Sequence, residues 1–188
     1  MGYLKEYYER ILKLQENEWH FIASHFTRKV FSKNQIITPQ GDIENYLSFV
    51  ETGIIRSYFQ DDEKEITFNI CFAKEFTCAH ESFLTQAPSA HELQALMKTI
   101  VWQISYADLQ KVYSETISGN ILGRIVSEKL FINKSRRELS FLRHTAKERY
   151  LNLFIEQPNI LKFIPLKYVA SYLGVTPQAL SRIRRQIY

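Results

Sequence analysis

The stretch IPLKYVASYLGVTPQALSRIRRQIY, residues 164–188, contains two short helical patterns on either side of a Gly-Val-Thr-Pro turn. Ala170 is small enough for two helices to cross closely, and Gly174 tolerates the left-handed geometry that ends a helix. Thr176 is a good N-cap and Pro177 suits the first helical position. The residues expected to face inward are Val169, Ala170, Leu173, Leu180, Ile183 and Ile187. The stretch therefore predicts a helix-turn-helix.

The second helix of this pattern carries a polar stripe at positions i, i+3, i+4 and i+7. Arginine can pair with guanine, glutamine with adenine, and serine with bases or phosphates, while a helix N-terminus favours a phosphate oxygen. The candidate DNA-binding residues are Lys167, Thr176, Pro177, Gln178, Ser181, Arg182, Arg184 and Arg185. The alternative is a basic helix pair that packs on another surface, since helical hairpins are common.

Charge is distributed unevenly along the chain. Residues 1–120 contain 11 Lys and Arg against 16 Asp and Glu, whereas residues 121–188 contain 13 against 4. This asymmetry suggests that the second part meets a polyanion, although a solvated basic face would have the same composition.

The middle of the chain differs from both ends. From Phe31 to about residue 108, short segments rich in β-branched and aromatic residues alternate with turn signals. Gly41 and Gly53 fall in two of these turns, where a positive φ is expected. This spacing predicts an antiparallel barrel or sandwich. Residues 1–30 have helical spacing instead.

A long amphipathic helix is predicted after residue 114. Its apolar residues recur at three- and four-residue steps: Ile117, Ile121, Leu122, Ile125, Val126 and Leu130. This stripe could lie on its own domain or on a twin helix from a second copy. Thr145 and Glu148 form a capping box at the start of the next helix.

The cysteines indicate neither a disulfide framework nor a metal site. Cys71 and Cys78 are the only two, and no histidine lies at a zinc-ligand spacing from them. We interpret both as buried structural thiols in a reducing cytoplasm, with a redox role as the alternative. No run of residues is long and apolar enough to span a bilayer, and residues 1–19 lack the apolar centre of a signal peptide.

In this order, the segments resemble those of the Crp/Fnr family of bacterial transcription regulators. The matching segments are residues 31–76 for the β-roll, 104–113 for its end, 139–154 for the start of the DNA-binding domain and 172–183 for the helix-turn-helix. The resemblance implies an α+β fold with an N-terminal jelly-roll β-roll. It divides the chain into a sensor domain (1–114), a dimerisation helix (115–138) and a helix-turn-helix domain (139–188). It also implies a homodimer, paired through residues 115–138, that places two recognition helices in successive major grooves of a palindromic site.

The effector that such a roll would bind is a separate question. Members that bind a cyclic nucleotide carry a phosphate cassette, a Gly-Glu pair followed by an Arg-Ser or Arg-Thr pair. Alignment without gaps places Cys78 and Ala79 at the first pair and Ser89 and Ala90 at the second. No arginine lies between Arg56 and Arg124, so a buried phosphodiester would lack a cation. We therefore expect no cyclic AMP binding by the family's usual route.

The candidate effector-pocket residues are accordingly Cys78, Ala79, His80, Glu81, Ser89, Ala90 and His91. No cysteine precedes Cys71, so the N-terminal iron–sulfur ligands of Fnr-type members are missing. Haem ligation by His80 or His91 has no positive support. We expect no cofactor and no metal, and the effector is left open.

A further expectation concerns the wing that commonly follows the recognition helix in this family. Only Tyr188 follows Ile187, so we expect a shortened winged helix, with any wing hairpin formed by residues 157–164.

The function expected from these features is sequence-specific binding of double-stranded DNA, with RNA polymerase as a further candidate partner. The alternative is a cyclic-nucleotide or other small-molecule module whose C-terminal domain contacts protein. An enzyme is not expected, because the histidines at 20, 25, 80, 91 and 144 are scattered and no catalytic motif or phosphate loop is present.

Overall fold

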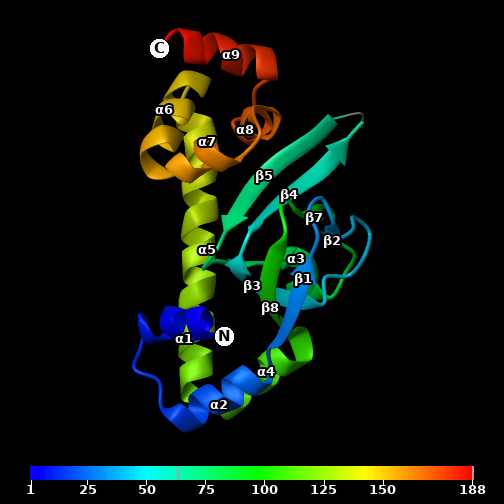
Figure 1. Cartoon of the computed structure of the whole chain (residues 1–188), viewed down its shortest axis with the longest axis vertical. Coiled ribbons are helices and arrows are strands. Elements are labelled where there is room, and N and C mark those ends of the chain that lie inside the picture. Colours follow the sequence, from blue (N-terminus) through cyan, green and yellow to red (C-terminus); the bar gives the residue numbers. More distant parts are fainter. Residues whose placement is uncertain (63, 188) are drawn as a thin grey trace. The chain divides into compact units, whose positions relative to one another are not determined.

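The computed structural model describes residues 1–62 and 64–187. It contains two compact units. The first, here called the roll unit, comprises Met1–Ser57 and Cys71–Lys129, and the second, called the C-terminal unit, comprises Tyr58–Ile70 and Leu130–Tyr188. Figure 1 labels all helices and all strands except β6, numbered in chain order.

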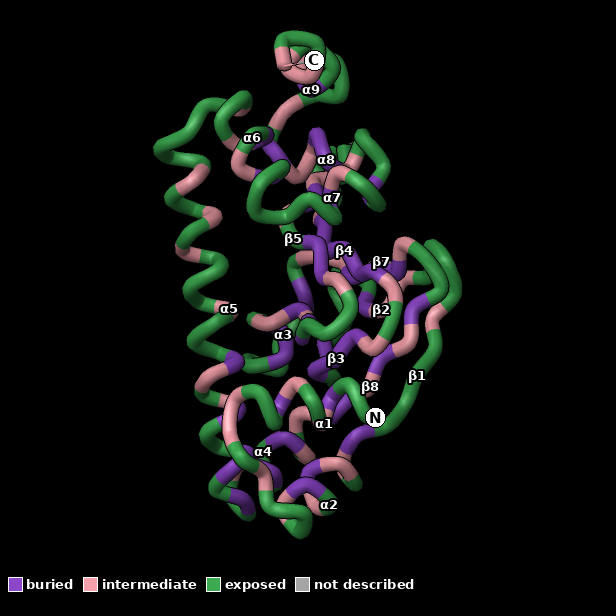
Figure 2. Tube along the Cα trace, turned by 60° about the vertical axis from the view of Figure 1, so that its left-hand side comes forward, coloured by how far each residue is buried: buried purple, intermediate pink, exposed green. Residues whose placement is uncertain are grey.

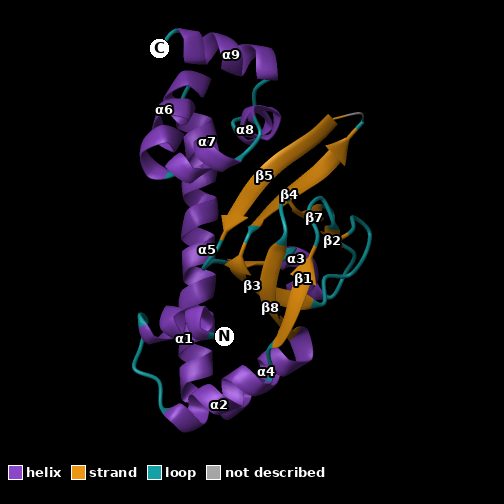
Figure 3. Ribbon diagram, viewed as in Figure 1, coloured by secondary structure: helices purple, strands orange, loops and turns teal. Residues whose placement is uncertain are grey.

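The strands form two four-stranded sheets in the orders β1-β8-β3-β6 and β2-β7-β4-β5 (Figure 3). The strands are β1 (Thr27–Phe31), β2 (Ile36–Thr38), β3 (Tyr46–Thr52), β4 (Ile54–Asp61), β5 (Lys64–Phe72), β6 (Phe76–Thr77), β7 (Glu92–Ala95) and β8 (Thr99–Ser105). The pairings of β1 and β3 with β8, of β3 with β6 and of β2 with β7 are all antiparallel. The predicted α+β fold with an antiparallel roll is confirmed.

The core of the roll unit joins both sheets. Val50 of β3 and Val101 of β8 are fully buried, and they pack in one cluster with Ile55 of β4 and Leu93 of β7. Hydrophobic contact between the two sheets is thus the main source of stability in this unit.

Helices flank these strands in the roll unit. They are α1 (Gly2–Glu9), α2 (Glu16–Ser24), α3 (His80–Thr85), α4 (Tyr106–Glu115) and the first part of α5 (Ile117–Arg143). Thr116 has an extended backbone and separates α4 from α5. Gly119 and Gly123 of α5 lie against α4: an added Cβ would come within 2.5 Å of Val112 Cγ1 and Tyr113 Cζ, respectively. The two helices pack closely because these positions have no side chain.

The start of the roll differs from the prediction. Residues 1–30 contain two helices and then β1, which begins at Thr27 rather than at Phe31. Four of the five residues of β1 are exposed, so the alternation that marks a half-buried strand is absent. The short helix α3 was also not predicted.

The C-terminal unit contains α6 (Ala146–Glu156), α7 (Pro158–Phe163), α8 (Leu166–Tyr172) and α9 (Pro177–Arg185). The predicted capping box is confirmed, because Thr145 accepts the N–H of Glu148 and the Glu148 carboxylate accepts the N–H of Thr145. The expectation that residues 157–164 supply a wing hairpin is wrong. Pro158 takes the first position of α7, and the fully buried Ile160 holds this helix on the unit.

The long helix α5 has two apolar faces. Leu122 and Val126 are buried in the roll unit, whereas Ile117 and Ile121 are exposed. Figure 2 shows that most of α5 is exposed along its length. Part of the predicted stripe thus packs on its own unit, and whether the exposed part meets a twin helix from a second copy stays a prediction. Within residues 1–62 and 64–187, no helix is both long enough and apolar enough to cross a membrane.

We predict that Gly53→Ala destabilises the roll unit by about 3 kcal/mol. Gly53 has a φ of +105°, and an added Cβ would lie 2.7 Å from the Cα of Thr99. Trp19 and Trp102 both lie in this unit, so tryptophan fluorescence during urea unfolding reports on it.

Gly41→Ala is the matched control, because Gly41 also has a positive φ but has open space around it. It should lower the free energy of unfolding by only about 1 to 2 kcal/mol. Equal effects of the two substitutions would contradict the close contact with Thr99.

Candidate nucleic-acid interface and effector pocket

The turn between α8 and α9 has the hydrogen bonds of a Schellman motif. The N–H of Gly174 donates to the carbonyl of Ser171 (2.9 Å), and the N–H of Val175 donates to the carbonyl of Ala170 (3.0 Å). Gly174 has a φ of +70°, the left-handed conformation that this motif requires at the position after the C-cap. The predicted role of this glycine in ending the first helix is confirmed.

The start of α9 also has the predicted chemistry. Thr176 Oγ1 accepts the N–H of Ala179 at 3.2 Å, and Pro177 takes the first helical position. The predicted inward residues Val169, Ala170, Leu173 and Leu180 are all buried, while Ile183 and Ile187 are half-buried. The hairpin therefore has a core of its own, and its sequence pattern was sufficient to find it.

The polar stripe of α9 faces solvent. Lys167, Thr176, Pro177, Gln178, Ser181, Arg182 and Arg185 are exposed and Arg184 is half-buried. No acidic residue lies in α9, and Arg182, Arg184 and Arg185 are in its last turn. The surface of this helix can therefore offer several hydrogen-bond donors and positive charges to a ligand at once.

Two arginines that the sequence analysis did not single out bind the end of α8. Arg137 Nη2 of α5 donates to the carbonyl of Tyr172 at 2.8 Å. Arg149 of α6 donates through Nε and Nη2 to the carbonyl of Leu173 (3.1 and 2.9 Å) and through Nη1 to that of His144 (2.7 Å). Burial lowers the pKa of the Arg137 guanidinium from its ordinary value. These bonds satisfy carbonyls that a helix leaves free at its C-terminus.

The ring of Phe141 contacts both guanidinium groups. Their central carbons are 4.7 Å (Arg137) and 4.6 Å (Arg149) from its centroid, within the range of a cation–π interaction. An added Cβ on Gly174 would lie 2.7 Å from Phe141 Cε1. We call Arg137, Phe141 and Arg149 the arginine clamp. Sequence reasoning could not find it, because the bonded carbonyls lie 35 and 24 residues away.

Strand β5 also contacts α8 within the C-terminal unit. The hydroxyl of Ser171 accepts the N–H of Thr67 at 2.8 Å and donates to the carbonyl of Glu65 at 3.0 Å. Strand β5 lies at the edge of its sheet. The Ser171 hydroxyl therefore makes the hydrogen bonds that a further strand would make there.

The candidate effector residues do not all meet at one place. Ala79 and Ser89 are buried, Cys78, His80 and His91 are half-buried, and Glu81 and Ala90 are exposed. The hydroxyl of Ser89 donates to the carbonyl of His91 at 2.7 Å. The Ser89 hydroxyl is thus hydrogen-bonded within the loop between α3 and β7.

A buried carboxylate is hydrogen-bonded beside the first cassette pair. Glu44 is 5% exposed, and its Oε2 accepts the N–H of Ala79 (3.2 Å) and the hydroxyl of Thr38 (2.8 Å). Its Oε1 accepts the N–H of Tyr46 at 3.0 Å. The backbone amide of Ala79, aligned with the cassette glutamate, is therefore already bonded to an acidic side chain of the protein itself.

A buried arginine in the roll was likewise missed. Arg56 of β4 is 1% exposed, and its Nε donates to Oε1 of Gln94 at 2.8 Å. The apolar residues around it in the sequence did not indicate a buried charged group. The bond to Gln94 links the side chains of two neighbouring strands, β4 and β7.

The two cysteines have different surroundings. Cys71 is buried, as predicted, and burial raises the pKa of its thiol well above the ordinary value. Cys78 is only half-buried, which corrects the prediction, and its Sγ lies 3.1 Å from Nδ1 of His80. In the described parts of the chain, no three His, Cys, Asp or Glu side chains are grouped so as to hold a metal ion.

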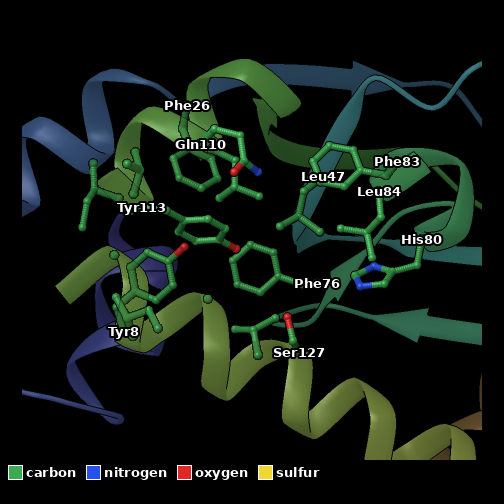
Figure 4. A pocket seen from close by; sticks show the side chains of 17 residues that line it. Tyr8, Phe26, Leu47, Phe76, His80, Phe83, Leu84, Gln110, Tyr113 and Ser127 are labelled. Carbon is green, nitrogen blue, oxygen red and sulfur yellow. The ribbon is translucent and has the colours of Figure 1, made fainter. Parts of the chain in front are cut away.

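A cavity of about 110 Å³ lies in the roll unit (Figure 4). Its walls come from α1, α2, α3, α4, the beginning of α5 and strands β3 and β6. Of the candidate effector residues, His80 lines it, and the other six do not. The remaining walls are mostly aromatic and aliphatic, with Tyr8, Gln110, Tyr113 and Ser127 as polar side chains.

Comparison with known proteins agrees with this architecture. Residues 28–116 match the family model described as the cyclic nucleotide-binding domain. No curated protein matches the chain.

Several solved structures resemble the chain over most of its length. FixK2 from Bradyrhizobium japonicum is 18% identical, with a TM-score of 0.73 over 86% of this chain and 84% of that one. CLP from Xanthomonas campestris, a c-di-GMP-responsive global regulator, is 14% identical, with a TM-score of 0.70 over 92% and 91%. A regulator assigned to the Crp/Fnr family from Eubacterium rectale is 18% identical, with a TM-score of 0.69 over 92% and 83%. Residues 28–116 are thus similar to the cyclic nucleotide-binding domain, and the chain has the fold of these solved regulators.

Proposed function

We propose that this chain is a sequence-specific DNA-binding regulator that acts as a homodimer in the bacterial cytoplasm. The observation that carries the proposal is the exposed stripe of α9. Its helix begins with a capped N-terminus and presents Gln178, Ser181, Arg182 and Arg185 to solvent. These side chains can bond base edges and phosphates in a major groove.

The exposed face of α5 supports the dimer. Apolar residues recur there at alternating four- and three-residue steps, with Glu128 and Ser135 at the two polar positions: Ile121, Ile125, Ile132, Leu139 and Leu142. All except the half-buried Ile125 are exposed. Such a seam suits a twin helix in a parallel coiled coil. We assign residues 1–114 to sensing, 115–138 to dimerisation and 139–188 to DNA binding, with RNA polymerase as a candidate partner.

The proposal includes an effector other than a cyclic nucleotide, or none. At the cassette positions the Ala79 amide binds Glu44 and the Ser89 hydroxyl binds a loop carbonyl. A cyclic phosphodiester would find a buried carboxylate there and no arginine from positions 57 to 123.

Selection of bound sequences from random double-stranded DNA tests the proposal. We expect enrichment of an inverted repeat whose half-site centres are about 10 base pairs, or a multiple of this, apart. An enriched site without symmetry would contradict the dimer. No enrichment would contradict DNA reading and favour a small-molecule module whose C-terminal domain contacts protein.

Substitutions in the C-terminal unit should separate base reading from phosphate contact. Arg182→Ala should abolish the preference for the selected site, a loss of about 5- to 150-fold in specific affinity. Lys167→Ala should weaken all DNA sequences about equally and reduce the salt dependence by about one charge. Fluorescence anisotropy with selected and scrambled duplexes measures both effects.

Arg10→Ala is the control for loss of one positive charge, because Arg10 is exposed and lies in the roll unit. It should bind both duplexes as the parent does. If Arg182→Ala and Lys167→Ala also did so, α9 would not be the reading helix.

Calorimetry provides a separate test of the cassette. We expect no saturable heat when cyclic AMP or cyclic GMP is added at micromolar concentration, because of the Glu44 carboxylate and the absence of a cassette arginine. Tight one-to-one binding would show that the phosphate finds a different cation.

A further inference from the structure

The cavity of the roll unit is not lined by either cassette pair, although His80, Phe83 and Leu84, which lie between the two pairs in sequence, form part of its wall. It is bounded by aromatic and aliphatic side chains, among them Phe26, Phe76, Phe83 and Leu122. None of the described residues that line it is Asp, Glu, Lys or Arg. A charged ligand would therefore lose its hydration there without compensation, and the cavity favours a neutral one.

Tyr8 places an unused hydrogen-bond donor at this cavity. The residue is 7% exposed, and its hydroxyl forms no hydrogen bond with any residue in the described part of the chain. Figure 4 shows this hydroxyl directed inward among the lining side chains, next to the ring of Tyr113. Burial raises the pKa of Tyr8, so the group keeps its proton. A hydroxyl at the wall of a cavity can donate a hydrogen bond to the acceptor atom of a ligand that enters it.

The volume limits the size of the occupant. A cavity of about 150 Å³ lined by Leu, Ile and Phe holds one benzene molecule. The cavity here is smaller, about 110 Å³. Two of the residues that line it, Leu84 and Ser127, are exposed to solvent. The comparison sets about benzene size as the upper limit for an occupant and excludes a nucleotide.

We propose that this cavity binds a small neutral molecule of benzene size. The molecule carries one hydrogen-bond acceptor, to which the Tyr8 hydroxyl donates. The apolar part of the ligand would contact Leu122 and Val126, so it would touch the first part of α5 directly. The proposal deepens the sensing role given above, but the binding itself requires neither DNA nor a dimer.

Phenol and toluene form a matched pair of probes, because they have the same shape and differ in the hydroxyl. We expect both to bind the full-length chain in ligand-observed NMR, with phenol about two- to tenfold tighter, the contribution of one neutral hydrogen bond. Benzoate, which is charged, should not compete. In methyl spectra, phenol should shift Leu122 and Val126, which line the cavity.

Tyr8→Phe keeps the ring and removes only the hydroxyl. It should weaken phenol to the level of toluene and leave toluene unchanged. Tyr3→Phe is the control, since it is the same change at an exposed tyrosine of α1 that does not line the cavity, and it should leave both affinities unchanged. Absence of phenol binding, or equal weakening by both substitutions, would overturn the proposal. Selection of DNA sites is independent of these measurements, so a failure of the ligand site and a failure of DNA reading can be told apart.

Discussion

The hydrogen bonds from Arg137 and Arg149 to the last carbonyls of α8 hold the turn on which the C-terminal unit depends. A helix end exposes carbonyl groups, and a sharp turn into α9 leaves no room for the next helical turn to satisfy them. The Schellman bonds at Gly174 satisfy two, and the arginine clamp satisfies those of Tyr172 and Leu173. The direction of α9 relative to α8 is thus set by backbone groups held from α5 and α6. The stripe of α9 can then consist almost entirely of polar residues, because its side chains have no part in holding the turn.

In the roll unit, by contrast, polar side chains are buried and form hydrogen bonds with other parts of the protein. The carboxylate of Glu44 binds the Ala79 amide, and Arg56 binds Gln94. At the positions that the sequence alignment assigns to the cassette, the Ala79 amide and the Ser89 hydroxyl are therefore bonded to other groups of the protein. The cavity of the roll unit, in contrast, is lined mainly by apolar side chains. The neutral occupant proposed above suits the charge and size of this space, and that proposal rests on a few side chains rather than on the fold.

How much could be predicted from the sequence depended on how local the determining contacts were. The turn at Gly174, the cap at Thr176 and the box of Thr145 and Glu148 each involve residues within four positions, and all were predicted correctly. Strand β1 was partly missed because its residues face solvent, so its sequence does not alternate. The helix α7 replaced the expected hairpin because Ile160 packs inside the unit. The arginine clamp and the bond of Glu44 to Ala79 join residues 24 to 35 positions apart, and no spacing pattern marks such pairs.

The glycines of α5 have a consequence for the order in which this helix forms. Glycine is about 1 kcal/mol less favourable than alanine inside a helix, and Gly119 and Gly123 lie in its first two turns. On its own, this segment would fray. It becomes helical by lying against Val112 and Tyr113, which approach closely where the glycines have no side chain. The later part of α5, after Gly123, contains no glycine or proline. Local opening should therefore begin at the junction with α4, and the exchange of backbone amide hydrogens with solvent there reports on the packing of α4 rather than on the helix as a whole.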